Sequence, residues 1–310
     1  MHHWIALRLE PLMEDEFIDD SYNCRKGKGT DYGIERIVEM IDTISCHYAK
    51  SIYVGKYDMR GYFMSIDKDI LWDMIKSLID RRYCGDDKQT LLYLTKETIY
   101  NIPQENCIRT CPLEEWDDIP KSKTLFSHPA NKGLPIGNLT SQLFANYYFS
   151  DIDREMKERH EGYSRYVDDG TIIAVTVDEI CDGFVYVRER SRQKGCEIHP
   201  NKFYIQPVAH GFKIIGRVIK PYRIYVSNRI RNKMRSKVIG FGKIRNVTRD
   251  VEFHLVQSMN SYLGLMNRLA AYNVKKENLE MIDPRYFEYI EIEGNYELLK
   301  MKKNGSKKNL

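Results

Sequence analysis

One stretch in the middle of the chain, YSRYVDDGTIIAV at 163–175, constrains the fold more than any other. Two apolar runs rich in β-branched residues flank Asp168, Asp169 and Gly170, which is the pattern of two strands joined by a tight turn. Adjacent carboxylates repel each other, and an ordinary surface turn gains nothing from the second one. Either the pair belongs to a plain polar turn, or a doubly charged cation lies in front of it.

Apolar spacing predicts alternating helices and strands around this hairpin. Helical spacing is found at 33–50, 67–80 (with Asp67 as the N-cap), 88–100, 139–160 and 177–195. Shorter β-rich runs predict strands at 51–59, 202–208, 212–219 and 223–227. Residues 101–132 contain four prolines and are predicted to form a long irregular insertion. From about 229 onward the pattern is helical, so the sequence indicates an α+β core followed by a helical part.

Length and charge limit the number of domains and the class of partner. A chain of 310 residues exceeds the usual size of one domain, which predicts two or three subdomains. The net charge is only +4, but basic residues cluster at 24–30, 229–237 and 300–310, and acidic residues at 14–20 and 114–118. Basic clusters can follow a phosphate backbone, and they can equally be solvated faces and tails. Composition leaves both interpretations open.

Cysteine spacing and hydropathy exclude other classes of protein. None of the seven cysteines lies in a CxxC pair, and Cys107 and Cys111 have no second pair nearby. We therefore expect reduced thiols rather than a zinc site. The chain has no run of 18 apolar residues and no signal-peptide segment at its N-terminus. We expect no membrane partner and a cytoplasmic location.

Asp58 adds a third carboxylate, in the stretch KYDMRGYF at 56–63. It ends a β-rich run far upstream of Asp168 and Asp169, so only the tertiary fold can bring the three acids together. If the strand at 51–58 lies beside the hairpin, three carboxylates converge at one end of a sheet, which is costly unless divalent cations neutralise them. Mg²⁺ suits such a site, and two ions about 3.5–4 Å apart clamp the attacking and leaving oxygens of a phosphoryl transfer.

Five motifs, in this order, give the chain a pattern that resembles the reverse transcriptases. They are KYDMRGYF (56–63), GLPIGNLTSQ (133–142), YVDD (166–169), GCEIHPNKFYI (195–205) and FKIIGRVI (212–219). The resemblance implies a right-hand polymerase fold of fingers, palm and thumb, with an antiparallel palm sheet backed by helices and a helical C-terminal thumb. It divides the chain into partial fingers (1–50), palm (51–220), thumb (221–290) and a basic tail (291–310) that we expect to be disordered. The family's basic fingers segment upstream of the motifs is expected to be shortened here.

The resemblance also assigns chemistry to the acids. Asp58, Asp168 and Asp169 would bind two Mg²⁺ ions, for which Mn²⁺ is a possible substitute, with the carbonyl of Met59 as an extra ligand. The primer 3′-hydroxyl would attack the α-phosphate of a dNTP, stabilised mainly by metal charge and positioning. The implied activity is RNA-directed DNA polymerase. The alternatives are a solvated acidic turn and a palm scaffold that binds RNA without turnover.

Other motif positions imply contacts with the nucleotide. Phe63 stands at the family's steric gate, where a ring packed against the sugar leaves no room for a ribose hydroxyl. Tyr62 is either the gating ring or a core residue. Ile136 and Gly137 belong to the loop beside the incoming nucleotide. Lys202 either meets the departing pyrophosphate or is a surface lysine.

Basic residues are the candidates for nucleic-acid binding. Arg25, Lys26 and Lys28 lie in a glycine-spaced loop that can approach phosphates, with a solvated basic loop as the alternative. The resemblance extends the predicted contacts to Gln142 and to the thumb residues Arg229, Arg231 and Lys233. The implied partners are template RNA, the primer or cDNA, dNTPs and a small basic accessory protein.

Two stretches narrow the resemblance. SYNCRKGKGT (21–30) and GLPIGNLTSQLFAN (133–146) look most like the enzymes of bacterial diversity-generating retroelements. Related group II intron and retron enzymes commonly carry glutamine where this chain has Ile136 and proline where it has Gln142. Isoleucine cannot hydrogen-bond near the nascent base pair, which implies tolerance of misincorporation, notably opposite template adenines. A residue that only lines the loop is one alternative, and a bacterial or phage-encoded retron, group II-like or defence-associated enzyme is another.

Overall fold

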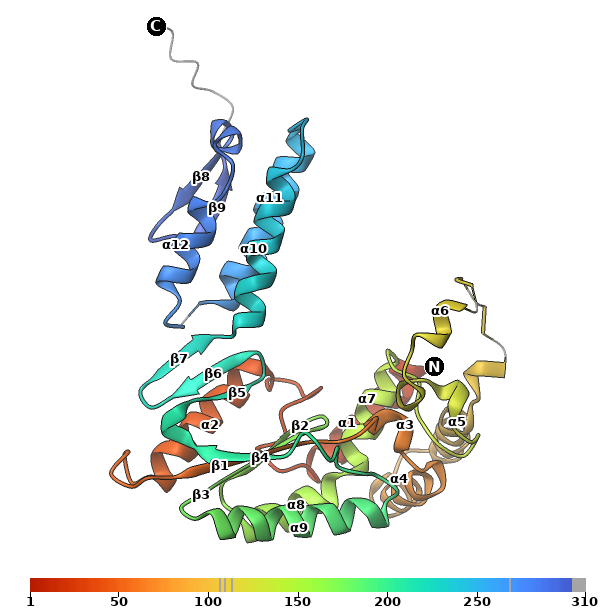
Figure 1. Cartoon of the computed structure of the whole chain (residues 1–310). Helices are drawn as coiled ribbons and strands as arrows, with labels where there is room; N and C mark the ends of the chain where they lie inside the picture. The colour runs from red at the N-terminus through yellow and green to blue at the C-terminus, as the bar shows by residue number, and fades with distance from the viewer. Residues whose placement is uncertain (106, 109, 113, 268, 303–310) are drawn as a thin grey trace, which may run out of the picture. The chain divides into compact units, whose positions relative to one another are not determined.

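The acid-tipped hairpin predicted at 163–175 is part of a four-stranded antiparallel sheet with strand order β2-β3-β1-β4 (Figure 1). Its strands are β1 (Tyr53–Asp58), β2 (Tyr163–Tyr166), β3 (Asp169–Ala174) and β4 (Tyr204–Pro207). The structure is a computed structural model that describes residues 1–302 apart from 106, 109, 113 and 268. The chain divides into two units, Met1–Pro207 and Val208–Leu310, and the sheet belongs to the first.

The hairpin turn has a strained backbone and a required glycine. Tyr166 pairs with Asp169, which leaves a two-residue loop of Val167 and Asp168. Val167 has a φ of +57°, a conformation that the tight hairpin turns use and that a β-branched residue rarely adopts. Gly170 follows because the Tyr57 ring lies across it: a Cβ at this position would lie 1.9 Å from the ring. The sequence VDDG therefore places Asp168 at the tip and Asp169 at the start of β3.

Helices α8 (Ser150–Arg159) and α9 (Val177–Gln193) cover one face of this sheet (Figure 1). Buried apolar residues of β1, β3, α8 and α9 belong to one core cluster, including Ile172, Ile180 and Val187. The single helix predicted at 139–160 is wrong in one respect, because it consists of α7 (Leu139–Tyr148) and α8. Phe149 has a ψ of 0° and a fully buried ring, so the chain breaks the helix where this ring enters the core.

The remaining helices of the first unit are α1 (His2–Glu14), α2 (Thr30–Ile44), α3 (Tyr62–Ser65), α4 (Lys68–Arg82) and α5 (Lys88–Tyr100). The predicted helices at 67–80 and 88–100 are confirmed, and the Asp67 carboxylate accepts the amide protons of Asp69 and Ile70 as an N-cap. The helix predicted at 33–50 ends at Ile44, because residues 46–48 have positive φ angles. The described residues of the insertion at 101–132 form short helical segments: η1 (Pro103–Glu105), α6 (Glu114–Asp117), η2 (Lys121–Lys123) and η3 (Leu125–Ser127).

A fully buried ion pair between Arg165 and Asp153 stabilises the hairpin. The guanidinium of Arg165 on β2 donates to both carboxylate oxygens of Asp153 on α8, and both side chains are 0% exposed. The same guanidinium donates to the carbonyl of Val167 at 2.7 Å and to the backbone and side chain of Asn146. Tyr163 donates its hydroxyl to Asp153. Arg165 therefore holds the turn that carries the two acids.

The second unit has its own core. It contains η4 (Val208–His210), an antiparallel sheet of β5 (Phe212–Ile214), β6 (Arg217–Lys220) and β7 (Arg223–Val226), α10 (Asn228–Gly242), α11 (Arg249–Leu265), α12 (Tyr272–Glu280), η5 (Pro284–Glu288), β8 (Ile290–Glu293) and β9 (Leu298–Met301). The chain leaves the first sheet at Pro207, the last residue of β4, and the boundary predicted between palm and thumb at 220 stays a prediction.

The expectation of a disordered tail from 291 is wrong for residues 291–301. Strands β8 and β9 pair as a hairpin, and Ile290 and Leu299 are buried in the core of the second unit. The side chain of Asn260 on α11 bonds both the amide and the carbonyl of Leu299, which fixes β9 on that helix. Residues 303–310 of the predicted tail lie outside the described residues.

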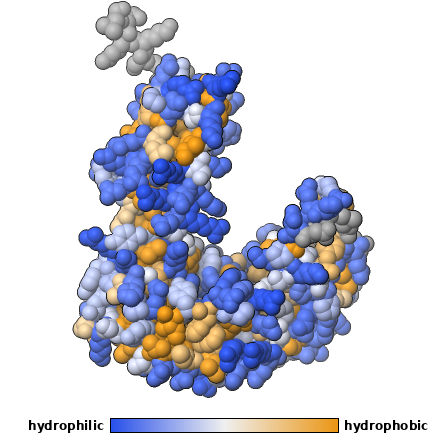
Figure 2. All heavy atoms as spheres, viewed as in Figure 1, coloured by the Kyte–Doolittle hydropathy of each residue, from blue (hydrophilic) through white to orange (hydrophobic). Residues whose placement is uncertain are grey.

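Figure 2 shows hydrophilic residues over most of the face in view, with hydrophobic residues scattered between them. Within residues 1–302, apart from 106, 109, 113 and 268, no helix has the length and hydropathy that crossing a bilayer requires. None of the seven cysteines is in a disulfide in this structure.

Candidate active site

The three predicted acids meet at one end of the first sheet. Asp58 is the last residue of β1 and lies directly opposite Asp169, the first residue of β3. The amide of Met59 donates to the carbonyl of Asp168 at 3.0 Å, which continues the pairing into the turn. The expectation that the early strand lies beside the hairpin is confirmed. Antiparallel pairing explains the convergence, because the end of β1 meets the start of β3.

The electrostatics of these acids are unfavourable without a cation. Burial, and then the charge of Asp169, raise the pKa of the Asp168 carboxyl to about 6. Burial also raises the pKa of Asp169, against an opposing effect of the Lys56 ammonium. The Lys202 ammonium lies 2.7 Å from a carboxylate oxygen of Asp58. Lys56 and Lys202 offset only part of the negative charge, since the pKa values of Asp168 and Asp169 stay raised, as expected of a site that takes additional positive charge.

The donor chemistry fits a hard divalent cation. Three carboxylates and a nearby backbone carbonyl at Met59 are oxygen ligands of the kind that Mg²⁺ or Mn²⁺ prefers. The side-chain conformations themselves do not form a closed site, since the described residues include no group of three His, Cys, Asp or Glu placed to hold a metal. Asp58 faces Lys202 instead, and binding a shared cation requires this ion pair to open or shift.

Asp58 and Asp168 lie in the wall of a cavity of about 690 Å³, which we call the central pocket. It gathers predicted residues from four separate motifs: Asp58, Met59, Tyr62, Phe63, Ile136, Asp168 and Lys202. Its wall also includes Pro120, Ser122 and Lys123, which no motif indicated, and His199, which lies within a motif but was not predicted as a site residue. The first three come from the irregular insertion, whose lack of periodicity gave no signal in the sequence.

The two aromatic residues after Asp58 have different environments. Tyr62 is 2% exposed and donates its hydroxyl to the carbonyl of Ala145, so it is anchored in the core. Phe63 is half-buried and packs edge-on against the Tyr62 ring, with ring centres 6.0 Å apart. Of the two candidates for a gating ring, Phe63 is the one free of a hydroxyl anchor.

The loop before α7 exposes its apolar residue. The Ile136 side chain forms part of the central pocket and is 69% exposed. Gly137 has a φ of +109° and open space where a Cβ would stand. Gln142, on α7, is half-buried, and its side-chain oxygen lies 3.0 Å from the sulfur of Cys24 in the basic loop.

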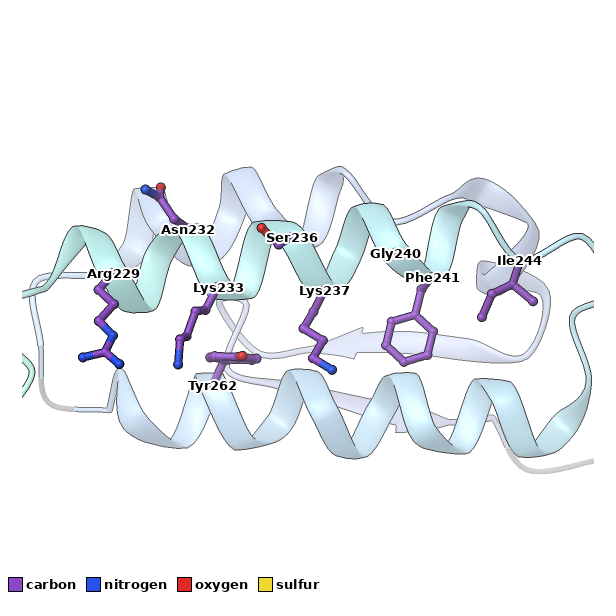
Figure 3. Close-up of a pocket in the computed structure, with 9 residues that line it drawn as sticks. All are labelled: Arg229, Asn232, Lys233, Ser236, Lys237, Gly240, Phe241, Ile244 and Tyr262. Atoms are coloured by element: carbon purple, nitrogen blue, oxygen red, sulfur yellow. The ribbon is translucent and has the colours of Figure 1, made fainter. Parts of the chain in front are cut away.

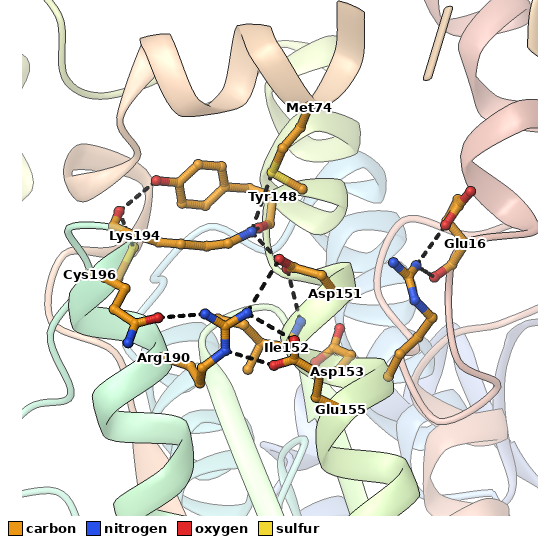
Figure 4. A network of polar contacts seen from close by, with 12 residues as sticks. Glu16, Met74, Tyr148, Asp151, Ile152, Asp153, Glu155, Arg190, Lys194 and Cys196 are labelled. Carbon is orange, nitrogen blue, oxygen red and sulfur yellow. Dashed lines mark hydrogen bonds and ion pairs between the residues drawn. The ribbon is translucent and has the colours of Figure 1, made fainter. Parts of the chain in front are cut away.

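A polar network fixes the start of the segment that carries Lys202 (Figure 4). Lys194 is buried, and its ammonium bonds the carbonyl of Tyr148 and the carboxylate of Asp151, both at 2.7 Å. Tyr148 returns a hydrogen bond from its hydroxyl to the carbonyl of Lys194. Arg190 joins the network through Asp151 and Glu155. The end of α9 is thereby attached to the junction of α7 and α8.

After this anchor the chain runs alongside the first acid. The amide of Arg60 donates to the carbonyl of Glu197, and the amide of His199 donates to the carbonyl of Asp58, each at 2.8 Å. These backbone bonds bring Lys202 to the mouth of the acidic cluster. The structure therefore places Lys202 in the site, in contact with Asp58 rather than as an isolated surface lysine.

The basic loop at 21–30 corrects one prediction. Arg25 is not available to a phosphate, because its side chain is 3% exposed and its guanidinium pairs with Glu14 and bonds two backbone carbonyls. Lys28 pairs with Asp19 at 2.7 Å, so part of its charge is already neutralised. Lys26 is exposed. The acidic run at 14–20 thus supplies the partners of the basic run, which sequence clustering did not indicate.

In the second unit, a groove of about 880 Å³ runs between α10 and α11 (Figure 3). Arg229, Lys233 and Lys237 point from α10 toward it, with Phe241 and Tyr262 among its other lining residues. This placement suits the predictions for Arg229 and Lys233. Arg231 is not among the lining residues, and its contact with nucleic acid stays a prediction.

Arg231 lies on another side of α10. Its guanidinium bonds the carboxylate of Glu277 on α12 at 2.7 Å. Residues two positions apart on a helix do not share a face. Arg229 and Lys233 therefore line the groove, while Arg231 between them faces α12. Arg231 therefore pairs with a neighbouring helix of the second unit in this structure.

Comparison with known proteins gives the family. Residues 1–219 match the family model described as reverse transcriptase (RNA-dependent DNA polymerase). The chain therefore belongs to the reverse transcriptases, the RNA-directed DNA polymerases, and has their right-hand polymerase fold. A search of curated proteins finds no match.

Solved structures agree on the fold. Apo telomerase from Candida tropicalis matches with a TM-score of 0.56 at 15% identity, over 92% of this chain and 48% of that one. Telomerase from Candida albicans in complex with a TWJ fragment of telomeric RNA matches with a TM-score of 0.50 at 9% identity, over 89% of this chain and 47% of that one. The chain spans about half the length of these telomerases.

Proposed function

We propose that this chain copies a template RNA into cDNA by two-metal nucleotidyl transfer. The observation that carries the proposal is the register of β1 against β3, which sets Asp58 opposite Asp169 with Asp168 beside them at the central pocket. Asp58, Asp168, Asp169 and the carbonyl of Met59 would hold two Mg²⁺ ions, with Mn²⁺ as a substitute. The ions would supply the positive charge that activates the primer hydroxyl and offsets the charge on the phosphates.

The parts of the chain take the roles of a polymerase hand in this proposal. Residues 1–50 contribute the fingers and the first sheet is the palm, while α10 and α11 belong to the thumb. Lys26 in the first unit, with Arg229 and Lys233 in the second, would contact phosphates of the template and primer. A hybrid of RNA and DNA is recognised chiefly by its shape and phosphates, which suits cations along a helix groove.

Primer extension on a defined RNA template tests the proposal. The full chain, a DNA primer, the four dNTPs and Mg²⁺ are expected to yield extended cDNA, and a chelator is expected to abolish it. The same primer on a template of unrelated sequence controls for annealing. RNA binding without any extension, in Mg²⁺ and in Mn²⁺, would instead identify a non-catalytic RNA-binding palm scaffold.

Phe63 is expected to select deoxynucleotides. The Phe63→Ala variant removes the half-buried ring from the wall of the central pocket and opens space beside Asp58. We expect the preference for dNTP over rNTP, measured as the ratio of kcat/KM values, to fall by about 10- to 100-fold, the range that a steric contact of this size supplies. The matched control is Tyr62→Phe, which removes only the hydroxyl bonded to Ala145. Equal ratios in wild type and Phe63→Ala would reject the gate.

Ile136 supports a finer proposal, that the enzyme is error-prone as in diversity-generating retroelements. An exposed aliphatic side chain at the pocket wall offers no hydrogen bond to the nascent base pair. In the Ile136→Gln variant we expect misincorporation opposite template adenines to fall about three- to tenfold, the effect of one neutral hydrogen bond. Sequencing of the cDNA measures this, with Ile136→Leu as the control. Unchanged adenine errors would favour a retron, group II-like or defence-associated enzyme.

The cellular setting remains part of the same proposal. A bacterial or phage-encoded enzyme of this type would act in the cytoplasm on a template-repeat RNA, together with a small basic accessory protein. A neighbouring variable gene with a near-copy template repeat would support this assignment over the retron alternative.

A further inference from the structure

A second cavity adjoins the central pocket and has a basic lining. This basic compartment has a volume of about 320 Å³ and is lined by Arg60, Lys121 and Lys132, with Glu197 as its carboxylate among the described residues. It shares Arg60, Gly61 and Ser122 with the central pocket. The two cavities are therefore separated only by the turn that follows Asp58 and by the insertion backbone that lies against it.

The cations of the compartment are not neutralised by partners. Arg60 and Lys121 are exposed and Lys132 is half-buried, and in the part of the chain that the structure describes none of the three forms an ion pair. The Lys132 ammonium lies close to the backbone of Gly195, where an added Cβ would come within 3.2 Å of it. Three positive side chains face one carboxylate, so the compartment suits an anion of high charge.

The insertion that supplies two of these cations is fixed at both ends. Gly61 has a φ of +54°, and a Cβ there would lie 2.3 Å from the carbonyl oxygen of Ser122, so this carbonyl lies directly against the turn. At the other end the amide of Lys68 donates to the carbonyl of Asn131 at 3.0 Å, and Lys132 forms a β-bridge with Asp67. The lysines therefore occupy defined positions beside the turn.

We infer that the basic compartment receives the pyrophosphate released by nucleotidyl transfer. The inference rests on the proposed function. In the transfer the primer 3′-oxygen bonds to the α-phosphorus, and the bond from that phosphorus to the α–β bridging oxygen breaks. The bridging oxygen keeps the electron pair, the hydroxyl proton passes to water, and pyrophosphate leaves with several negative charges. Arg60, Lys121 and Lys132 lie next to the pocket in which this anion forms.

Direct binding of pyrophosphate to the full chain tests the inference without any turnover. Isothermal titration in the absence of primer and template measures the Kd of wild type and of the Lys121→Ala/Lys132→Ala variant. We expect the double variant to bind at least about tenfold more weakly, since two charge-assisted contacts are lost. Lys76→Ala, which removes an exposed lysine of α4, is the charge control and is expected to bind like wild type.

A variant of opposite sign makes the test stricter. Glu197→Gln removes the carboxylate of the compartment and is expected to tighten pyrophosphate binding severalfold. If the double lysine variant fails to fold, Glu197→Gln still tests the inference. Wild-type affinity in both variants, or no binding to wild type, would overturn the inference even if primer extension succeeds. Weaker binding in the lysine variant together with absent extension would keep the compartment and reject the proposed function.

Discussion

Asp168→Asn is expected to reduce primer extension by at least about a thousandfold while making the metal-free protein more stable. The loss follows because an amide cannot supply the negative charge that holds a divalent cation, and the charge stabilisation that the cation provides amounts to several kcal/mol. Asp58→Asn is expected to give a similar loss. The control is Asp86→Asn, which makes the same substitution on an exposed loop away from the site and is expected to be fully active.

The gain in stability comes from the pKa of the same carboxyl. Burial and the neighbouring Asp169 raise the pKa of Asp168 to about 6 from an ordinary value of 3.8. The folded state then binds a proton more tightly than the unfolded state, so stability falls as the pH rises through the window from about 4 to about 6. Above that window the charged acid destabilises the metal-free fold by about 1–3 kcal/mol, and the asparagine variant escapes this penalty.

Thermal melts in a chelator, at pH 4 and at pH 7.5, measure the effect. Wild type is expected to lose stability relative to Asp168→Asn between the two values, and Mg²⁺ is expected to raise the melting temperature of wild type alone. A variant that melts below wild type at pH 7.5 without metal would contradict this account. It would mean that Asp168 supports the fold rather than straining it.

The site was predictable because it depends on strand pairing and little else. A strand ending in Asp58 and a hairpin starting β3 at Asp169 need only antiparallel register to bring the acids together. Both strands are predicted by their β-rich runs. The glycine after the two acids is required because the Tyr57 ring leaves no room for a Cβ. The order of motifs along the chain therefore carried the geometry of the active site.

The parts that sequence reasoning missed depend on particular tertiary partners. Arg25 lies in a basic, glycine-spaced loop of the kind that binds phosphate, but its guanidinium forms an ion pair with Glu14 on α1. Leu299 lies in the predicted disordered tail, just before the basic run at 300–310, but Asn260 on α11 bonds both its amide and its carbonyl. Lys121 lies in the insertion, where no periodic pattern predicts its position. It lines the basic compartment because the neighbouring Ser122 packs against Gly61. Local pattern cannot choose between such partners.

Arg165→Met is expected to lower the free energy of unfolding by about 3–5 kcal/mol, the usual effect of removing one member of a fully buried ion pair. The Asp153 carboxylate would then remain buried with only Tyr163 as a donor. For a unit of this size the loss corresponds to a fall of roughly 6–20 °C in the melting temperature. Arg154→Met, whose pair with Glu16 lies at the surface, is the matched control and is expected to cost less than about 1 kcal/mol.

A double variant separates the ion pair from the packing around it. Arg165→Met with Asp153→Leu removes both charges of this buried pair, so it is expected to recover much of the stability that the single variant loses. It is not expected to recover activity, because the guanidinium also bonds the carbonyl of Val167 and thereby holds the strained turn before Asp168. Primer extension below the melting temperature checks this. A stable double variant with wild-type extension would show that the turn keeps its shape without Arg165.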